Sequence, residues 1–159
     1  MGFGQGRSGA HWPKNFSLLE FSISLVELGQ RMVRRGLETY EKPQRSLDDM
    51  EVVLARAEES SGDKDSFSRC DGEFHLLIAR ASANPLLLSV YRQINQVRLH
   101  AQWNAMKENI LTPDVITDYN RQHRGIYNAL HERDAQAAQA LITEHLEKAR
   151  DDLLRANSP

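Results

Sequence analysis

The sequence predicts an all-α fold, an antiparallel bundle of helices joined by short connections. Apolar residues recur at spacings of three and four through most of the chain. Capping residues and prolines separate these segments, and no segment alternates apolar and polar residues with the period of two that marks a strand. The 159 residues, of which 40% are hydrophobic and 26% charged, suit one domain with its own core.

The composition argues against several classes of protein. A net charge of −2 does not indicate the basic face that nucleic-acid-binding domains carry. No apolar run approaches the roughly 18–20 residues that span a membrane, and no signal peptide is recognisable. Cys70 is the single cysteine, so an intrachain disulfide is excluded, and this fits a reducing compartment. We therefore expect a cytoplasmic protein without a membrane partner.

The N-terminal part is expected to contain a leader and a first helix. Residues 1–15 are predicted to be a flexible leader or interdomain linker because four glycines cluster there, and the helical domain is expected at residues 16–157. Ser17 and Glu20 form a capping-box pattern that predicts a helix start, and the helix is expected to end at Gly36. The apolar face of this helix would be Leu18, Phe21, Leu25, Leu28 and Met32.

The second helix is expected to start near Pro43 and to end at the turn formed by residues 60–63. Its apolar face would be Leu47, Met50, Leu54 and Ala57. The third helix should run from about Asp65 to Ala83. Its apolar face would be Phe67, Asp71, Phe74, Ile78 and Ala81. An acid therefore occupies a position that the periodicity predicts to be buried.

Three further helices follow. Asn84 and Pro85 form a cap and first turn, and the fourth helix is expected to extend to about Lys107. Thr112 and Pro113 repeat this signal for the fifth helix, and a turn near residues 133–134 precedes the sixth. The expected apolar face of the fourth helix is Leu87, Tyr91, Ile94, Val97 or Arg98, and Ala101. That of the fifth helix is Ile116, Tyr119, His123, Ile126 or Tyr127, and Leu130. That of the sixth helix is Ala138, Leu141, Ile142, His145, Ala149 and Leu153.

Four polar side chains are predicted to face one another inside this bundle. Asp71 and His75 are four residues apart, which places both on one face of a helix. His123 and His145 lie on the apolar faces of two later helices. Burying such groups without partners costs a few kcal/mol or more. A shared divalent ion is one explanation, because imidazole and carboxylate suit zinc, nickel, iron or manganese.

The residues alone leave a second interpretation open. A histidine on an apolar helix face is often a core residue bonded to a carbonyl or hydroxyl group, and acid–histidine pairs are common on solvated helix faces. The other candidates are weaker: Cys70 should point about 100° away from Asp71, Glu73 should point elsewhere, and His100 and His131 should face solvent or a helix end.

At these residues the chain resembles a known family. The matching segments are Asp71-Gly-Glu-Phe-His75, Ile78-Ala-Arg-Ala-Ser-Ala-Asn84, His123-Arg-Gly-Ile-Tyr-Asn-Ala129 with Arg133, Asp134 and Ala138 following, and His145. Their order and spacing resemble the FCD domain, the all-helical effector-binding C-terminal domain of FadR-type regulators in the GntR superfamily. The resemblance extends from about Leu18 to Leu154.

The resemblance implies specific properties. It makes Asp71, His75, His123 and His145 the ligands of a divalent metal in a bundle of six or seven helices with a cavity beside the ion. We take zinc as the expected metal, with nickel, iron and manganese as alternatives. It implies a small organic acid as effector, a homodimer, and no catalytic activity. DNA would be bound only through an N-terminal winged helix-turn-helix, for which 159 residues leave no room.

One position departs from the family pattern. Many members carry an arginine in the first helix where Ser22 falls in this chain. Such an arginine is a natural carboxylate anchor, because its planar fork bonds both oxygens. Arg98, on a face of the fourth helix, is the candidate substitute for binding the effector.

Three functions are carried forward from the sequence. The first is a sensory module of a transcription regulator, in which a metal and a small acid control DNA binding by another domain. The second is a metal-dependent hydrolase or isomerase, since open coordination positions can activate water. The third is a metal-free helical interaction domain whose histidines are core residues.

Overall fold

The structure, a computed structural model, describes residues 43–60, 62–98 and 101–156. The expected leader, the expected first helix and Ser22 lie outside the described residues. Within them the chain forms six helices and no strand, so the all-α prediction is confirmed. The helices are α2 (Pro43–Glu59), α3 (Lys64–Ala81), α4 (Pro85–Val97), α5 (Ala101–Ile110), α6 (Pro113–His131) and α7 (Ala135–Ala156).

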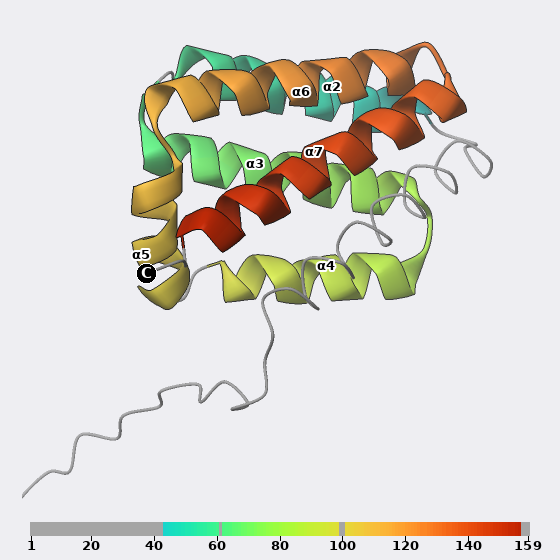
Figure 1. The fold of residues 1–159 in the computed structure, drawn as a ribbon. Helices are drawn as coiled ribbons and strands as arrows, with labels where there is room; N and C mark the ends of the chain where they lie inside the picture. The colour runs from blue at the N-terminus through green and yellow to red at the C-terminus, as the bar shows by residue number, and fades with distance from the viewer. Residues whose placement is uncertain (1–42, 61, 99–100, 157–159) are drawn as a thin grey trace, which may run out of the picture.

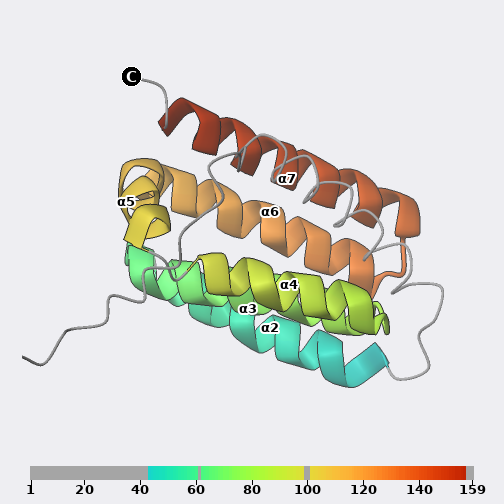
Figure 2. The ribbon, with the colours of Figure 1, turned by 90° about the horizontal axis from the view of Figure 1, so that it is seen from below.

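The long helices run side by side and α5 crosses one end of the bundle (Figures 1 and 2). Helix α3 packs between α2 and α4, α6 packs on α2 and on α7, and α5 packs on α7. Consecutive long helices run antiparallel, as Figure 1 shows for α2 and α3 and for α6 and α7. None of the described helices has the length and apolarity needed to cross a membrane.

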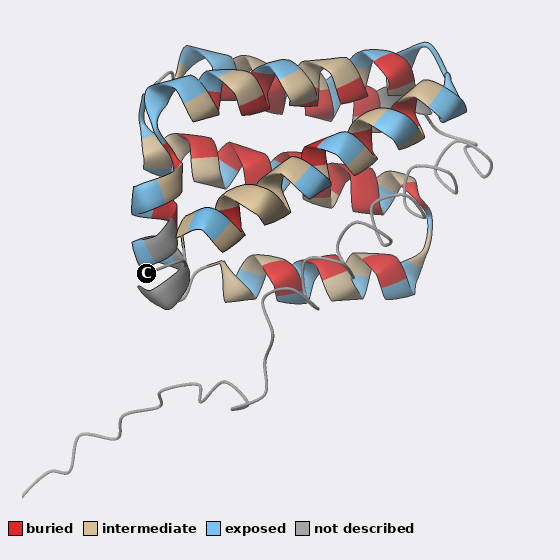
Figure 3. Ribbon diagram, viewed as in Figure 1, coloured by how far each residue is buried: buried red, intermediate tan, exposed pale blue. Residues whose placement is uncertain are grey.

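The inward faces of the helices form the core, and they are the faces that the periodicity predicts (Figure 3). Isoleucine, leucine, methionine and phenylalanine side chains from five helices meet there. Those with at most 1% exposure are Met50, Leu54, Phe74, Ile78, Ile126 and Ile142, and Ile116 in a neighbouring cluster. Burial of this apolar surface, at about 25 cal/mol per Å², is the main term that stabilises the bundle.

Capping residues set the helix starts where the sequence predicts them. The Asn84 side chain accepts hydrogen bonds from the backbone N–H groups of Leu86 and Leu87, at 3.0 and 3.3 Å, and Pro85 occupies the first turn. At the start of α6 the Thr112 side chain accepts a hydrogen bond from the backbone N–H of Val115, and Pro113 occupies the first turn of that helix.

The expected fourth helix is divided in two. Helix α4 ends at Val97, the backbone N–H of Arg98 donates to Ile94 O, and α5 begins at Ala101 in a different direction. A continuous helix to Lys107 was therefore wrong. The spacing of apolar residues carries information only about neighbouring turns of a helix. The break between α4 and α5 is instead accompanied by contacts between distant segments, because the Arg98 guanidinium donates to Asp71 and α5 packs on α7.

Replacing Asn84 with alanine is expected to lower the free energy of unfolding by about 1 kcal/mol, because two N–H groups at the start of α4 lose their acceptor. Urea denaturation followed by circular dichroism measures the change. Asn128→Ala, at an exposed position inside α6, is the matched control and should cost little. Equal effects of the two substitutions would contradict the capping role.

Candidate metal centre

Helix α3 presents Asp71 and His75 one turn apart on its buried face. Asp71 is 4% exposed and His75 is 3% exposed. The Asp71 Oδ1 atom lies 3.6 Å from His75 Nε2. Both side chains point into the bundle from the same side of α3, as their spacing of four residues predicts.

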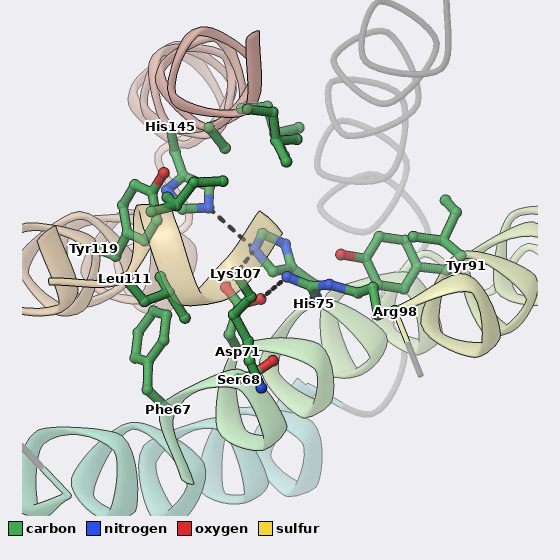
Figure 4. A pocket seen from close by; sticks show the side chains of 15 residues that line it. Phe67, Ser68, Asp71, His75, Tyr91, Arg98, Lys107, Leu111, Tyr119 and His145 are labelled. Atoms are coloured by element: carbon green, nitrogen blue, oxygen red, sulfur yellow. Dashed lines mark hydrogen bonds and ion pairs between the residues drawn. The ribbon is translucent and has the colours of Figure 1, made fainter. Parts of the chain in front are cut away.

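Helices α6 and α7 bring the two remaining histidines to the same point. His123 Nε2 lies 3.2 Å from Asp71 Oδ1, and His145 Nε2 lies 3.1 Å from His75 Nε2 and 3.2 Å from His123 Nε2. Figure 4 shows the ring of His145 reaching from α7 toward His75. One ligand atom from each of the four residues lies within 4.8 Å of the others, and all four residues are buried.

The spacing of these atoms fits a single coordinated cation. Nitrogen ligands lie about 2.0–2.1 Å from zinc, so two of them separated by angles of about 90–110° are about 2.9–3.4 Å apart. The observed Nε2 separations of 3.1 and 3.2 Å fall in that range. The donor set of three imidazoles and one carboxylate suits a divalent transition metal.

Arg98 holds the second oxygen of the Asp71 carboxylate. Its guanidinium donates to Asp71 Oδ2, while Oδ1 faces the histidines. Burial by itself raises the pKa of the Asp71 carboxyl group. The charge of Arg98 and hydrogen bonds from His123 and His75 outweigh it and hold that pKa well below its ordinary value. Asp71 is therefore an ionised, acceptor-only group.

Burial acts in the opposite direction on the histidines. Removal from water lowers the pKa of His75, and the neighbouring Asp71 carboxylate does not fully offset this. The pKa of His145 is lowered further, by burial and then by the repulsion that its protonated ring would meet from protonated His123 and His75. Both rings are therefore neutral near pH 7, which is the form that binds a metal.

A cavity of about 100 Å³ adjoins the cluster, and it includes Asp71, His75 and His145 in its wall. The wall is mostly apolar but contains two cations, Arg98 from the end of α4 and Lys107 from α5. Lys107 is 9% exposed and its amino group donates to Asp65 Oδ1 at 2.6 Å. The other lining residues are Phe67, Ser68, Tyr91, Ile94, Ile110, Leu111, Tyr119, Leu146, Ala149 and Leu153.

The structure separates the remaining sequence candidates from the cluster. Cys70 packs in the aliphatic core, Glu73 is exposed and paired with Arg56, and His131 is exposed. His100 lies outside the described residues. Arg98 does reach the cavity, where its guanidinium donates to Asp71 Oδ2.

Two residues at the site carry no periodicity signal that the sequence analysis used. Gln122 directly precedes His123 on α6, and its Oε1 atom lies 2.9 Å from His145 Nδ1, within hydrogen-bond distance. Lys107 lies on a helix whose direction the sequence did not predict. A polar residue beside an inward histidine is a signal that could have identified Gln122.

Comparisons with known proteins agree with the resemblance. The FCD domain family model matches residues 27–148. The putative L-lactate dehydrogenase operon regulatory protein of Escherichia coli K12 is 33% identical over 86 residues, 54% of this chain and 33% of that protein. The Uxu operon transcriptional regulator of the same strain is 30% identical over 104 residues, 65% of this chain and 40% of that protein.

The chain thus matches well under half the length of these curated relatives. Among solved structures, E. coli McbR/YncC superimposes with a TM-score of 0.75 at 18% identity, covering 87% of this chain and 65% of that one. This last similarity shows a shared fold.

The stability of the metal-free protein is expected to fall as the pH is lowered from about 7 to 5.5. Unfolded histidines take up protons below a pKa of about 6.5, whereas His75 and His145 resist protonation in the fold, so protons favour the unfolded state. The free energy of unfolding should drop by up to about 1.4 kcal/mol per pH unit for each of these groups. Urea titrations in the presence of a chelator at several pH values measure it.

His145→Gln should flatten this pH dependence, because one proton-resistant group is removed. His131→Gln, at an exposed position, is the control and should leave the dependence as in the unaltered protein. If the His145→Gln profile ran parallel to that of the unaltered protein, the neutral buried state assigned to His145 would be wrong.

Proposed function

The chain belongs to the FCD domain family, whose matched relatives are GntR-family regulators, and we propose that it is the ligand-sensing domain of such a regulator. It binds a divalent metal through Asp71, His75, His123 and His145, with zinc as the first candidate and nickel, iron or manganese as the others. A small organic acid binds beside the metal. DNA is bound through a separate N-terminal domain, and the regulator acts as a homodimer.

The convergence of the four buried side chains is the observation that carries this proposal. They come from three helices, α3, α6 and α7, and meet with separations that suit ligands of one ion. A bound metal would supply an electrophilic centre with positions open to an oxygen ligand. The protein's own part is to hold three imidazoles and one ionised carboxylate at fixed positions, which lowers the cost of assembling the site.

The adjoining cavity supports an anionic ligand. Its walls are mostly apolar, and its two cationic side chains, Arg98 and Lys107, lie at the end of α4 and on α5 rather than on the helices of the cluster. A carboxylate in an apolar cavity is stabilised most by charge-assisted hydrogen bonds from such groups. Binding controls a regulator only if the ligand has different affinities for two conformations.

An enzymatic role is the alternative. Metal-dependent hydrolysis needs a general base within reach of the reacting water. Among the described residues that line the cavity, the carboxylate is Asp71, which already bonds Arg98 and faces the histidines. The matched relatives are named as operon regulators, which favours the sensory role.

Zinc is expected to bind the metal-stripped protein at about one equivalent and to raise its melting temperature by several degrees, because a ligand of the native state stabilises it by mass action. His145→Ala and Asp71→Ala should lose most of this stabilisation. Isothermal titration and differential scanning fluorimetry measure both effects, with nickel, iron(II) and manganese(II) run in parallel.

His131→Ala is the control for histidine loss, since this side chain is exposed at the end of α6. Absence of metal from the purified protein, together with equal melting temperatures with and without added zinc or the other ions, would rule out the metal-binding proposal and favour a metal-free interaction domain.

A panel of small carboxylic acids is expected to contain at least one that raises the melting temperature of the zinc-loaded protein but not that of Asp71→Ala. Arg98→Gln should weaken binding of that acid about tenfold or more, because a charge-assisted hydrogen bond is worth about 1.5–3 kcal/mol. Arg92→Gln, at an exposed position on α4, is the matched control.

Zinc affinity is measured on the same variants, so that an effect through Asp71 is separated from an effect on the acid. Stabilisation by no member of the panel would contradict the acid-sensing part of the proposal. Chemical conversion of the stabilising acid, followed by NMR, would instead support the enzymatic alternative.

A further inference from the structure

We propose that Gln122 is a positioning residue that holds the His145 imidazole in the Nδ1–H form and directs its Nε2 lone pair to the other two histidines, and that Asp118 sets the orientation of the Gln122 carboxamide. The consequence for metal affinity rests on the proposed function above. The positioning itself does not, and can be measured in the metal-free protein.

The first link is the contact between His145 and Gln122. The Nδ1 atom of His145 lies 2.9 Å from Oε1 of Gln122. A carboxamide oxygen can only accept, so the ring nitrogen must carry the proton. A neutral imidazole has one N–H group, which leaves the Nε2 atom with its lone pair. That atom is the one that lies 3.1 Å from His75 Nε2 and 3.2 Å from His123 Nε2.

The second link fixes which end of the carboxamide faces His145. Gln122 Nε2 donates to Oδ2 of Asp118, one turn earlier on α6, at 2.9 Å. With the amide reversed, its oxygen would face a carboxylate and its N–H₂ group would face His145, which would select the opposite tautomer. A carboxylate accepts only, so Asp118 discriminates between the two orientations.

Asp118 is itself held by two cations. Arg121 on the next turn of α6 donates to its Oδ1, and the Lys148 amino group from α7 lies 3.7 Å from its Oδ2. The Asp118 side chain is 26% exposed, whereas His145 is 3% exposed. The hydrogen bonds therefore connect the Asp118–Arg121 ion pair at the surface, through Gln122, to the buried imidazole of His145.

This arrangement gives α6 two tasks in the same turn. His123 points into the cluster, and the preceding Gln122 reaches across to α7 and orients His145. Groups that hydrogen-bond the second ring nitrogen of a ligating histidine fix its tautomer, and their loss typically weakens metal binding about 10–100-fold. We expect an effect of this size from Gln122.

The experiment uses the full chain, labelled with ¹⁵N-histidine and stripped of metal. Long-range ¹H–¹⁵N NMR spectra distinguish protonated from unprotonated ring nitrogens. The unaltered protein should show His145 with a protonated Nδ1. Gln122→Met, of similar length but without an acceptor, should show a mixture or the Nε2–H form, and Asp118→Ala should show a smaller shift in the same direction. Gln122→Glu retains an acceptor and should keep the Nδ1–H form.

Zinc affinity is measured on the same proteins by competition with a chromogenic chelator. Gln122→Met is expected to raise the dissociation constant about tenfold or more. Gln136→Met is the control, because this glutamine is exposed and lies nine residues before His145 on α7, roughly 13 Å along the helix axis.

The inference is overturned if His145 in the unaltered protein carries its proton on Nε2, or if Gln122→Met leaves the Nδ1–H signature unchanged. If the unaltered protein bound no metal, the proposed function would fail while the spectra still decided the role of Gln122. Should Gln122→Met not fold, the position of the His145 proton in the unaltered protein still decides the inference, and Asp118→Ala, whose side chain is 26% exposed, tests the orientation of the carboxamide.

Discussion

One constraint governs this structure: an ionised carboxylate and three imidazoles are buried at a single point in a helical core. An uncompensated buried charge costs several kcal/mol, so the surrounding residues must supply partners. Arg98 bonds one oxygen of Asp71, and the histidines face the other. Gln122 bonds the outer nitrogen of His145. These contacts account for the orientation of the cluster, and the cation proposed above would account for its convergence.

Two groups of helices supply the side chains of the cluster and the cations of the cavity. Helices α3, α6 and α7 carry the four converging side chains, while α4 and α5 carry the cations that line the adjoining cavity. The change of direction between α4 and α5 serves both groups. It places Arg98 where it reaches Asp71, and it brings Lys107 to the cavity wall with its amino group paired to Asp65. The cavity is therefore lined by α4 and α5 as well as by the three helices that carry the cluster.

Much of this could be predicted from the sequence, for an identifiable reason. Helical spacing places Asp71, His75, His123 and His145 on buried faces, and capping residues locate the helix starts, because both signals are local in the chain. The end of α4 could not be predicted in this way. It accompanies a contact between residues 27 positions apart, and no local pattern records such a contact. Gln122 was missed for a related reason: its role depends on how α6 and α7 approach each other.

The antiparallel turn between α6 and α7 makes the number of residues between the two histidines a functional quantity. His123 and His145 are 22 positions apart and meet across that turn. One residue inserted into α7 ahead of His145 would rotate the following side chains by about 100° and carry the imidazole off the inward face. An insertion of four residues would nearly restore the direction but would displace the ring about 6 Å along the axis. The length of this segment is therefore as restricted as the identity of its histidines.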